Sequence, residues 1–215
     1  MLWVFYYSEI CTYKSIIEVL RTLKQHQTIW FFTMLTVIFT SQNLLAQEFQ
    51  LNNSKSKMSI FGTSSLHDWE ETVEEQSGKI QLSNQGTLTI TNLNVSIVAE
   101  SLKSGKSAMD KNTYKALDTK NHKNITFKMK ESKKVKALGN DNYQVTVSGV
   151  MTISGVSKPI DLSFKMTVTT ESVTLEGEKS FNMKDYGIEP PKALLGTITT
   201  GEVVRIKFKS ILTNQ

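Results

Sequence analysis

Two runs of alternating apolar and polar residues, joined by one short turn, constrain the fold of this chain most strongly. The first run spans residues 143–153 and the second spans residues 160–169. Ser154-Gly155 interrupts the alternation between them. A period of two on both sides of a glycine turn is typical of an antiparallel hairpin with one buried face. Pro159 is expected at the start of the second strand, because it lacks the N–H that a ladder needs.

Strand-like segments of the same kind recur through residues 47–215. They are 47–51, 57–62, 78–82, 88–99, 125–130, 173–183 and 203–212. The alternation changes phase at Asn92, which indicates a β-bulge that helps a sheet to curl. One helix is predicted over 107–118, with Ser107 and Asp110 as a capping box. The pattern predicts an all-β fold, an antiparallel β-barrel of about eight strands with one short α-helix.

Residues 1–46 have the pattern of an N-terminal extension and secretory signal peptide. Arg21 and Lys24 precede an uncharged apolar run over 29–39, and Ala46 supplies a small residue for cleavage. The run is shorter than the ~20 residues of a spanning helix, which favours a signal helix over a membrane anchor. We therefore expect a barrel domain over 47–215 that is periplasmic or secreted.

Few residues in the expected mature domain suggest catalysis or metal binding. The single cysteine, Cys11, lies within the predicted extension, so the domain has no disulfide or thiolate ligand. His67 and His122 lack a metal-binding spacing, although His67 beside Asp68 keeps an enzymatic hypothesis open. Gly105-Lys106-Ser107 is not a P-loop, because the required earlier glycine is replaced by a glutamate. We expect no enzyme activity, no metal and no cofactor.

Lysine is concentrated in residues 101–136, where eleven lysines oppose three acidic residues, a net charge of +8. A solvated face is the simplest interpretation. A second is contact with an anionic membrane surface, since clustered lysines attract anionic head groups. A nucleic-acid surface is disfavoured by the expected export and by the scarcity of interleaved aromatic residues, so we expect no nucleic-acid partner.

The interior of the predicted barrel is the main functional question. A barrel of eight strands either fills itself with side chains or holds one small ligand. Methionine and phenylalanine can repack around an extended chain, but periodicity does not distinguish a cavity from a core. The candidate residues for an apolar cavity are Phe61, Trp69, Ile90, Leu117, Phe127, Met129, Val147, Met151, Leu162, Phe164, Met166, Phe181, Tyr186 and Phe208.

Four blocks of the sequence, taken in order, resemble the YceI-like family and in particular its Bacteroidetes-type branch. Residues 63–69 (TSSLHDW) resemble its opening block, and residues 149–160 (GVMTISGVSKPI) resemble its hairpin. The segment 101–127 resembles the central helix block, and 185–196 resembles the late loop. The match covers about residues 50–212, and four ordered blocks are far more specific than any one of them.

This resemblance implies an exported, lipocalin-like barrel that binds a long apolar molecule, typically a polyisoprenoid such as a quinone tail. It implies a non-enzymatic binder or carrier with no cofactor other than this lipid. Many members have Arg-Asp where this chain has Met109-Asp110, so Lys106 and Lys111 become the head-group candidates. The alternative is a structural or interaction module with a fully packed barrel and no ligand. The oligomeric state does not follow from the sequence.

Overall fold

The computed structural model describes residues 47–84 and 86–214, so the predicted signal over 1–46 lies outside the described residues. The described part has one α-helix, α2 (Ser107–Ala116), and short 3₁₀ turns η2 (Asn53–Lys55), η3 (Ala99–Ser101), η4 (Met183–Tyr186) and η5 (Leu194–Gly196). Its strands are β1 (Gln47–Leu51), β2 (Lys57–Ser64), β3 (Trp69–Val73), β4 (Gln76–Asn84), β5 (Leu88–Val98), β6 (Leu102–Lys103), β7 (Asn124–Gly139), β8 (Asn142–Ile153), β9 (Val156–Val168), β10 (Ser172–Asn182), β11 (Lys192–Ala193) and β12 (Ile198–Thr213).

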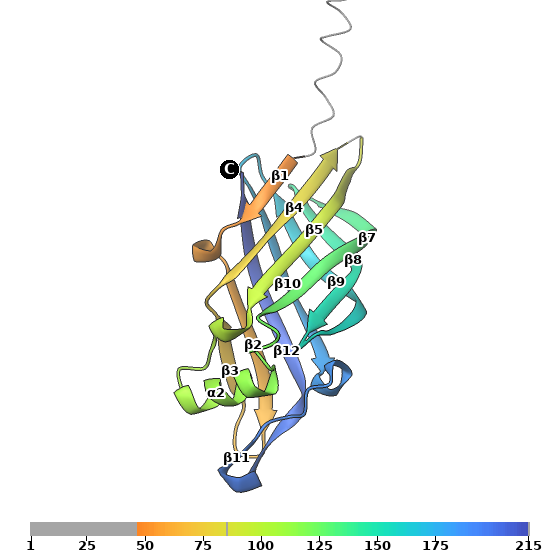
Figure 1. Cartoon of the computed structure of the whole chain (residues 1–215). Coiled ribbons are helices and arrows are strands. Elements are labelled where there is room, and N and C mark those ends of the chain that lie inside the picture. Colours follow the sequence, from red (N-terminus) through yellow and green to blue (C-terminus); the bar gives the residue numbers. More distant parts are fainter. Residues whose placement is uncertain (1–46, 85, 215) are drawn as a thin grey trace, which may run out of the picture. The chain divides into compact units, whose positions relative to one another are not determined.

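Eight antiparallel strands close into a barrel, which confirms the predicted fold class (Figure 1). The ring runs β1-β4-β5-β7-β8-β9-β10-β12 and closes where Gln50 and Leu51 of β1 pair with Thr213 and Leu212 of β12. Strands β2, β3 and β6 extend the sheet from β12. The helix α2 lies at the end of the barrel that also holds β11, away from β1 (Figure 1).

The predicted hairpin is formed by β8 and β9, in register from Asn142↔Thr167 to Ile153↔Val156. Its turn is the dipeptide Ser154-Gly155, with φ of 48° and 77°, as a type I′ turn requires. The expectation for Pro159 is wrong: β9 begins at Val156, and Pro159 pairs with Val150 inside the strand. The register of β9 with β10 runs only from Phe164 to Val168, so Pro159 lies where β9 is an edge and proline is tolerated.

The predicted bulge is confirmed between β4 and β5. Gln81 pairs with Asn92 and Leu82 pairs with Ile90, so Thr91 is the extra residue. Strand β7 continues to Gly139, well beyond the predicted end, because its lysine-rich second half pairs with β8 across three register shifts. Strand β3 was not predicted, because an acidic segment gave no sign of a buried face.

The predicted capping box of α2 is wrong. The N-cap is Lys106, whose side chain makes no capping hydrogen bond. The Asp110 carboxylate instead accepts from the backbone N–H of Ser104 at 2.9 Å and from its hydroxyl at 2.6 Å. The carboxylate therefore closes the turn before the helix, which ends at Ala116 two residues earlier than predicted.

The end of the barrel at β1 is filled by apolar side chains. Phe49, Ile80, Val145, Met166 and Val173 are fully buried there. Closely packed interiors of this kind tolerate neither cavities nor extra volume without a cost in stability. The barrel interior is therefore packed with side chains at the β1 end, and the hollow part lies towards α2.

Candidate functional site

A cavity of about 340 Å³ opens at the α2 end of the barrel. Ligand pockets in proteins commonly measure about 300–1,000 Å³, so the space is of a size that holds a small molecule or part of a long one. Its walls come from β2, β3, β12 and α2, with single residues from β5, β6, β7, β8 and β10. The apolar lining includes Met58, Ile60, Trp69, Ile97, Leu102, Met109, Leu117, Ile125, Ile153, Phe181, Met183, Ile188, Val204 and Ile206.

A second cavity of about 70 Å³ adjoins the first one. The two share Met58, Ile97, Ile125 and Ile206 as lining residues. Farther from the opening the second cavity is lined by Phe127, Met151, Leu162, Phe164 and Phe208. Phe164 packs edge-on against Phe208, with ring centroids 6.4 Å apart and an angle of 66°. Together the cavities form an apolar interior that leads from the α2 end towards the packed end.

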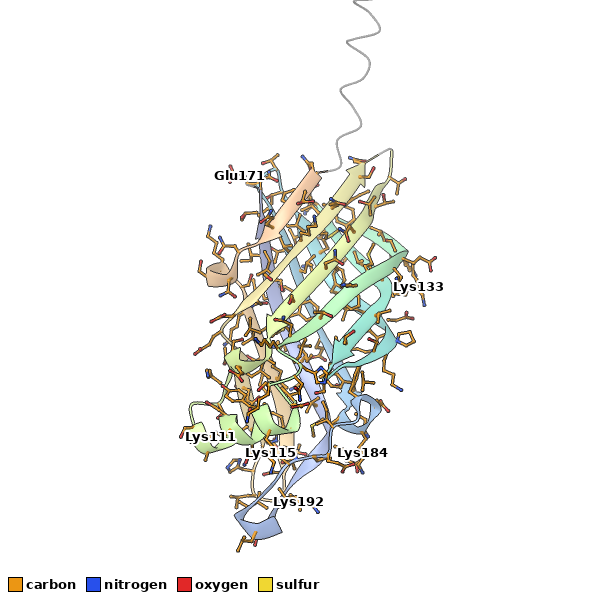
Figure 2. The ribbon with its side chains drawn as sticks, in the orientation of Figure 1. Lys111, Lys115, Lys133, Glu171, Lys184 and Lys192 are labelled. Carbon is orange, nitrogen blue, oxygen red and sulfur yellow. The ribbon has the colours of Figure 1, made fainter. Side chains whose placement is uncertain are left out.

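The mouth of the main cavity is formed by exposed residues from three segments. Leu66 and His67 belong to the β2–β3 turn, Lys106 and Asn112 to the helix region, and Lys192 to β11. The β2–β3 turn is fixed to the start of β12 by two hydrogen bonds between Ser65 and Thr199, at 2.9 and 3.1 Å. Figure 2 shows Lys111, Lys115 and Lys192 together at this end of the barrel.

Helix α2 is held over the cavity by hydrogen bonds near its C-terminal end. Tyr114 donates its hydroxyl proton towards the carbonyl oxygens of Glu100 and Leu102, at 2.8 and 3.1 Å. Ser154, in the β8–β9 turn, donates to the carbonyl oxygen of Leu117 at 2.9 Å. The Leu117 side chain is buried against the cavity. The hairpin turn therefore positions the helix that covers the site.

A buried carboxyl, that of Glu71, lines the main cavity. Thr113 of α2 donates its hydroxyl proton to Glu71 Oε1 at 2.5 Å. Burial raises the pKa of Glu71; the hydrogen bond from Thr113 opposes this rise, and the nearby negative charge of Asp110 adds to it. The site thus combines an apolar wall with one buried carboxyl.

Eight of the predicted cavity residues line one of the two cavities. Trp69, Leu117 and Phe181 line the main cavity, and Phe127, Met151, Leu162, Phe164 and Phe208 line the second one. Their contact with a ligand stays a prediction. Of the two head-group candidates, Lys106 lines the mouth of the main cavity, whereas Lys111 is exposed on α2 and lines neither cavity.

The other predicted residues lie elsewhere. Ile90, Val147 and Met166 are buried in the packed part of the barrel, and Met129 is half-buried against it. Tyr186 is buried beside Phe181, with ring centroids 5.3 Å apart. Phe61 lies on the outer face, where the guanidinium carbon of Arg205 is 5.1 Å from its ring centroid. The alternation explains this: Ile60 lines the cavity, so its neighbour Phe61 points outward.

Sequence reasoning missed Glu71 and Lys179. Lys179 pairs with Ile206 in register and lines the second cavity. The alternation of Val173, Leu175, Gly177 and Phe181 would have placed Lys179 inward. Glu71 is flanked by Trp69 and Val73 at a spacing of two, but the acidic residues around it hid this signal.

Within 47–84 and 86–214 no three or more His, Cys, Asp or Glu side chains are grouped to hold a metal ion. Over the same residues, no helix combines the length and the apolar character needed to cross a membrane.

Comparisons with known proteins agree with the fold. The family pattern described as the YceI-like domain matches residues 49–211. The crystal structure of BcnA from Burkholderia cenocepacia superimposes with a TM-score of 0.61 at 17% identity, covering 76% of this chain and 99% of that one. A polyisoprenoid binding domain from Saccharophagus degradans gives 0.61 at 15% identity, with 78% and 98% covered. A YceI protein of Campylobacter jejuni gives 0.54 at 16% identity, with 67% and 84% covered. None of the curated proteins compared with the chain matches it.

Proposed function

Because this chain belongs to the YceI-like family, we propose that it binds a long apolar lipid inside its barrel and carries it outside the cytoplasm. The main support is the pair of adjoining apolar cavities, reached through one polar mouth at the α2 end. A barrel of the same fold in Saccharophagus degradans is described as a polyisoprenoid binding domain. A polyisoprenoid is therefore the ligand class that we propose for this chain.

The proposed lipid places its tail in the second cavity and its polar end in the main one. The second cavity is lined mostly by aromatic and aliphatic side chains, with Lys179 as its one charged residue, whereas the mouth holds His67, Lys106 and Lys192. At ~0.8 kcal/mol per buried methylene, one five-carbon isoprene unit contributes roughly 3–4 kcal/mol before the costs of binding. A few units supply enough free energy for binding without a strong polar contact.

The export in this proposal rests on the sequence pattern of residues 1–46, a basic flank followed by a short apolar run. The role as a binder and not an enzyme rests on the cavity lining, which is largely apolar. His67 and Asp68, the residues that suggested catalysis, are both exposed, and His67 lies at the mouth.

Contact with an anionic membrane is the second part of the proposal. Leu66 at the mouth is 67% exposed, and Leu195 in η5 is fully exposed. Lys111 and Lys115 on α2 and Lys192 on β11 lie at the same end of the barrel (Figure 2). Apolar tips beside lysines suit a surface that meets anionic head groups, each lysine contributing about 1 kcal/mol. Docking there would bring the mouth to the membrane from which a lipid is taken.

Native mass spectrometry of the protein purified from its own periplasm tests the proposal. The expected result is a mass increment that organic solvent removes and that added polyprenyl lipid restores. Repeated recovery without bound lipid, together with no uptake of added lipid, would contradict it. That result would favour the alternative, a structural or interaction module that binds no ligand in its barrel.

A further inference from the structure

Glu71 occupies an unusual position in the wall of the cavity. It lies on β3 opposite Ile60 in register, so both side chains point to the interior. Its side chain is only 1% exposed, and Thr113 is the one described residue that hydrogen bonds its carboxyl. An acidic side chain this deeply buried is rare unless an opposite charge or a set of donors accompanies it.

No described cation neutralises this carboxyl. On α2, the groups nearby are Thr113 and Asp110, and Asp110 is itself engaged with Ser104. On β6, Lys103 directs its ammonium to the Tyr114 hydroxyl at 2.5 Å. On β2, the opposing residue is the apolar Ile60. Lys106 and His67 line the mouth of the same cavity, and Asp110 is the one charged group among the described residues that shifts the pKa of Glu71. On β10, Lys179 lies in the same cross-strand row as Glu71, with Ile206 and Ile60 between them.

These surroundings favour the neutral carboxylic acid over the carboxylate. Burial is the largest cause of the raised pKa of Glu71, and the charge of Asp110 acts in the same direction. A neutral carboxyl offers one O–H donor and one accepting oxygen. Thr113 satisfies one oxygen and fixes the orientation of the group, which leaves hydrogen-bonding capacity directed into an apolar space.

We propose that Glu71, oriented by Thr113, recognises the polar end of the bound lipid, and that this end is an uncharged hydrogen-bonding group such as a hydroxyl or an amide. The proposal rests on the lipid binding proposed above and adds the class of head group. A phosphate or carboxylate beside Glu71 would be a second buried acid near Asp110 and would bear a large desolvation cost. An anionic head group would therefore stay at the mouth, beside Lys106.

Paired ligands with identical tails test this assignment. A short polyprenol and its monophosphate are titrated into the delipidated protein, with the matching hydrocarbon as a ligand without a head group. The variants are Glu71→Gln, which keeps a donor and an acceptor, and Glu71→Leu, which removes both. Glu70→Gln, on the exposed outer face of the same strand, is the matched control. Thermal unfolding of each variant without ligand shows whether the barrel is intact.

The wild type should bind the alcohol about tenfold more tightly than the hydrocarbon and more tightly than the phosphate, as expected for one or two buried hydrogen bonds. Glu71→Gln should keep most of this preference, Glu71→Leu should lose it while still binding the hydrocarbon, and Glu70→Gln should behave as the wild type. Equal preference for the alcohol in the wild type and Glu71→Leu would overturn the assignment, as would tighter binding of the phosphate by the wild type. Failure of all three ligands to bind the wild type would instead count against lipid binding itself.

Discussion

The indole ring of Trp69 lies against the backbone of Gly62, so that a Cβ atom at Gly62 would stand 2.2 Å from the ring carbon Cζ2. The two residues pair across β2 and β3, and Trp69 Nε1 donates to the carbonyl oxygen of Thr63 at 3.0 Å. A glycine at this position lets the ring lie flat in the wall of the main cavity. Trp69 and Gly62 therefore set the shape of the cavity next to its mouth.

Gly62→Ala should force the Trp69 ring away from β2. We expect a loss of about 1–3 kcal/mol in the free energy of unfolding, typical of overpacking, together with a shift in tryptophan emission. Urea denaturation followed by fluorescence and circular dichroism measures both. In the Trp69→Leu background the same change should cost clearly less, because the ring is gone. An equal cost in both backgrounds would show that Trp69 is not the cause.

Two phenylalanines of the cavity lining should contribute differently to the stability of the fold. Phe164 is 2% exposed and packs against Phe208, so Phe164→Ala should cost about 3–5 kcal/mol of stability. Phe181 is only partly buried in the main cavity, so Phe181→Ala should cost less than half as much and weaken lipid binding. Denaturation and lipid titration of both variants test the difference. Equal losses of stability would mean that the wall of the main cavity is as firmly packed as the surroundings of Phe164.

The stability of the protein should depend on pH through Glu71. Its pKa is raised in the folded state by burial, so the stabilising contribution is fully present below the pKa of the unfolded chain and is lost as the pH rises through the folded value. Glu71→Gln should therefore gain stability relative to the wild type as the pH increases. Denaturation in urea from about pH 4 to pH 8 measures this difference.

Subtracting the free energy of unfolding of Glu71→Gln from that of the wild type removes the contributions of other titrating groups. Asp110 and Glu202 have lowered pKa values, Asp110 because Ser104 donates to it and Glu202 because Lys184 and Asn182 do. Their stabilising contributions are lost as the pH falls, but equally in the wild type and in Glu71→Gln. The exposed control Glu70→Gln should leave the slope unchanged. If the difference in unfolding free energy between the wild type and Glu71→Gln did not change with pH, Glu71 would be no harder to ionise in the folded protein than in the unfolded chain.

The β8–β9 turn should depend on Gly155. This residue has a φ of 77°, and a Cβ there would stand 2.5 Å from Cε1 of His122. Gly155→Ala should cost about 1–2 kcal/mol for the left-handed backbone, and more from the contact with His122. Combining Gly155→Ala with His122→Ala should remove only the cost of the contact with His122 and leave the cost of the backbone. Thermal unfolding of the single and double variants measures both, and full rescue would show that the backbone is not strained.

Local patterns in the sequence predicted the barrel because one face of each long strand is buried. The alternation in β8 and β9 and the phase change at Asn92 were correctly interpreted, since both follow from a period of two. The bulge at Asn92 also favoured a closed barrel, and the family blocks agreed with it. The cap of α2 and the end of β7 were missed, because Asp110 bonds to a residue before the helix and the lysines of β7 pair across bulges.

The candidate site was less accessible from the sequence than the fold. Alternation tells which residues point inward but not whether they meet neighbours or empty space. Met166 and Phe164 have the same periodicity, yet only Phe164 lines a cavity. Glu71 was missed because its acidic neighbours hid the alternation and because its hydrogen-bond partner, Thr113, lies 42 residues away in the chain.

Photocrosslinking tests most directly whether the barrel interior holds the lipid tail. A polyprenol with a diazirine at the far end of its tail is bound to the full-length protein, and the complex is irradiated. Peptide mass spectrometry then identifies the residues that carry the crosslinked lipid. Adducts should form at residues of the second cavity, such as Met151, Leu162 and Phe164, and an excess of unlabelled polyprenol should suppress them. Adducts confined to the outer face, for example around Phe61, or adducts that unlabelled polyprenol does not suppress, would contradict the account.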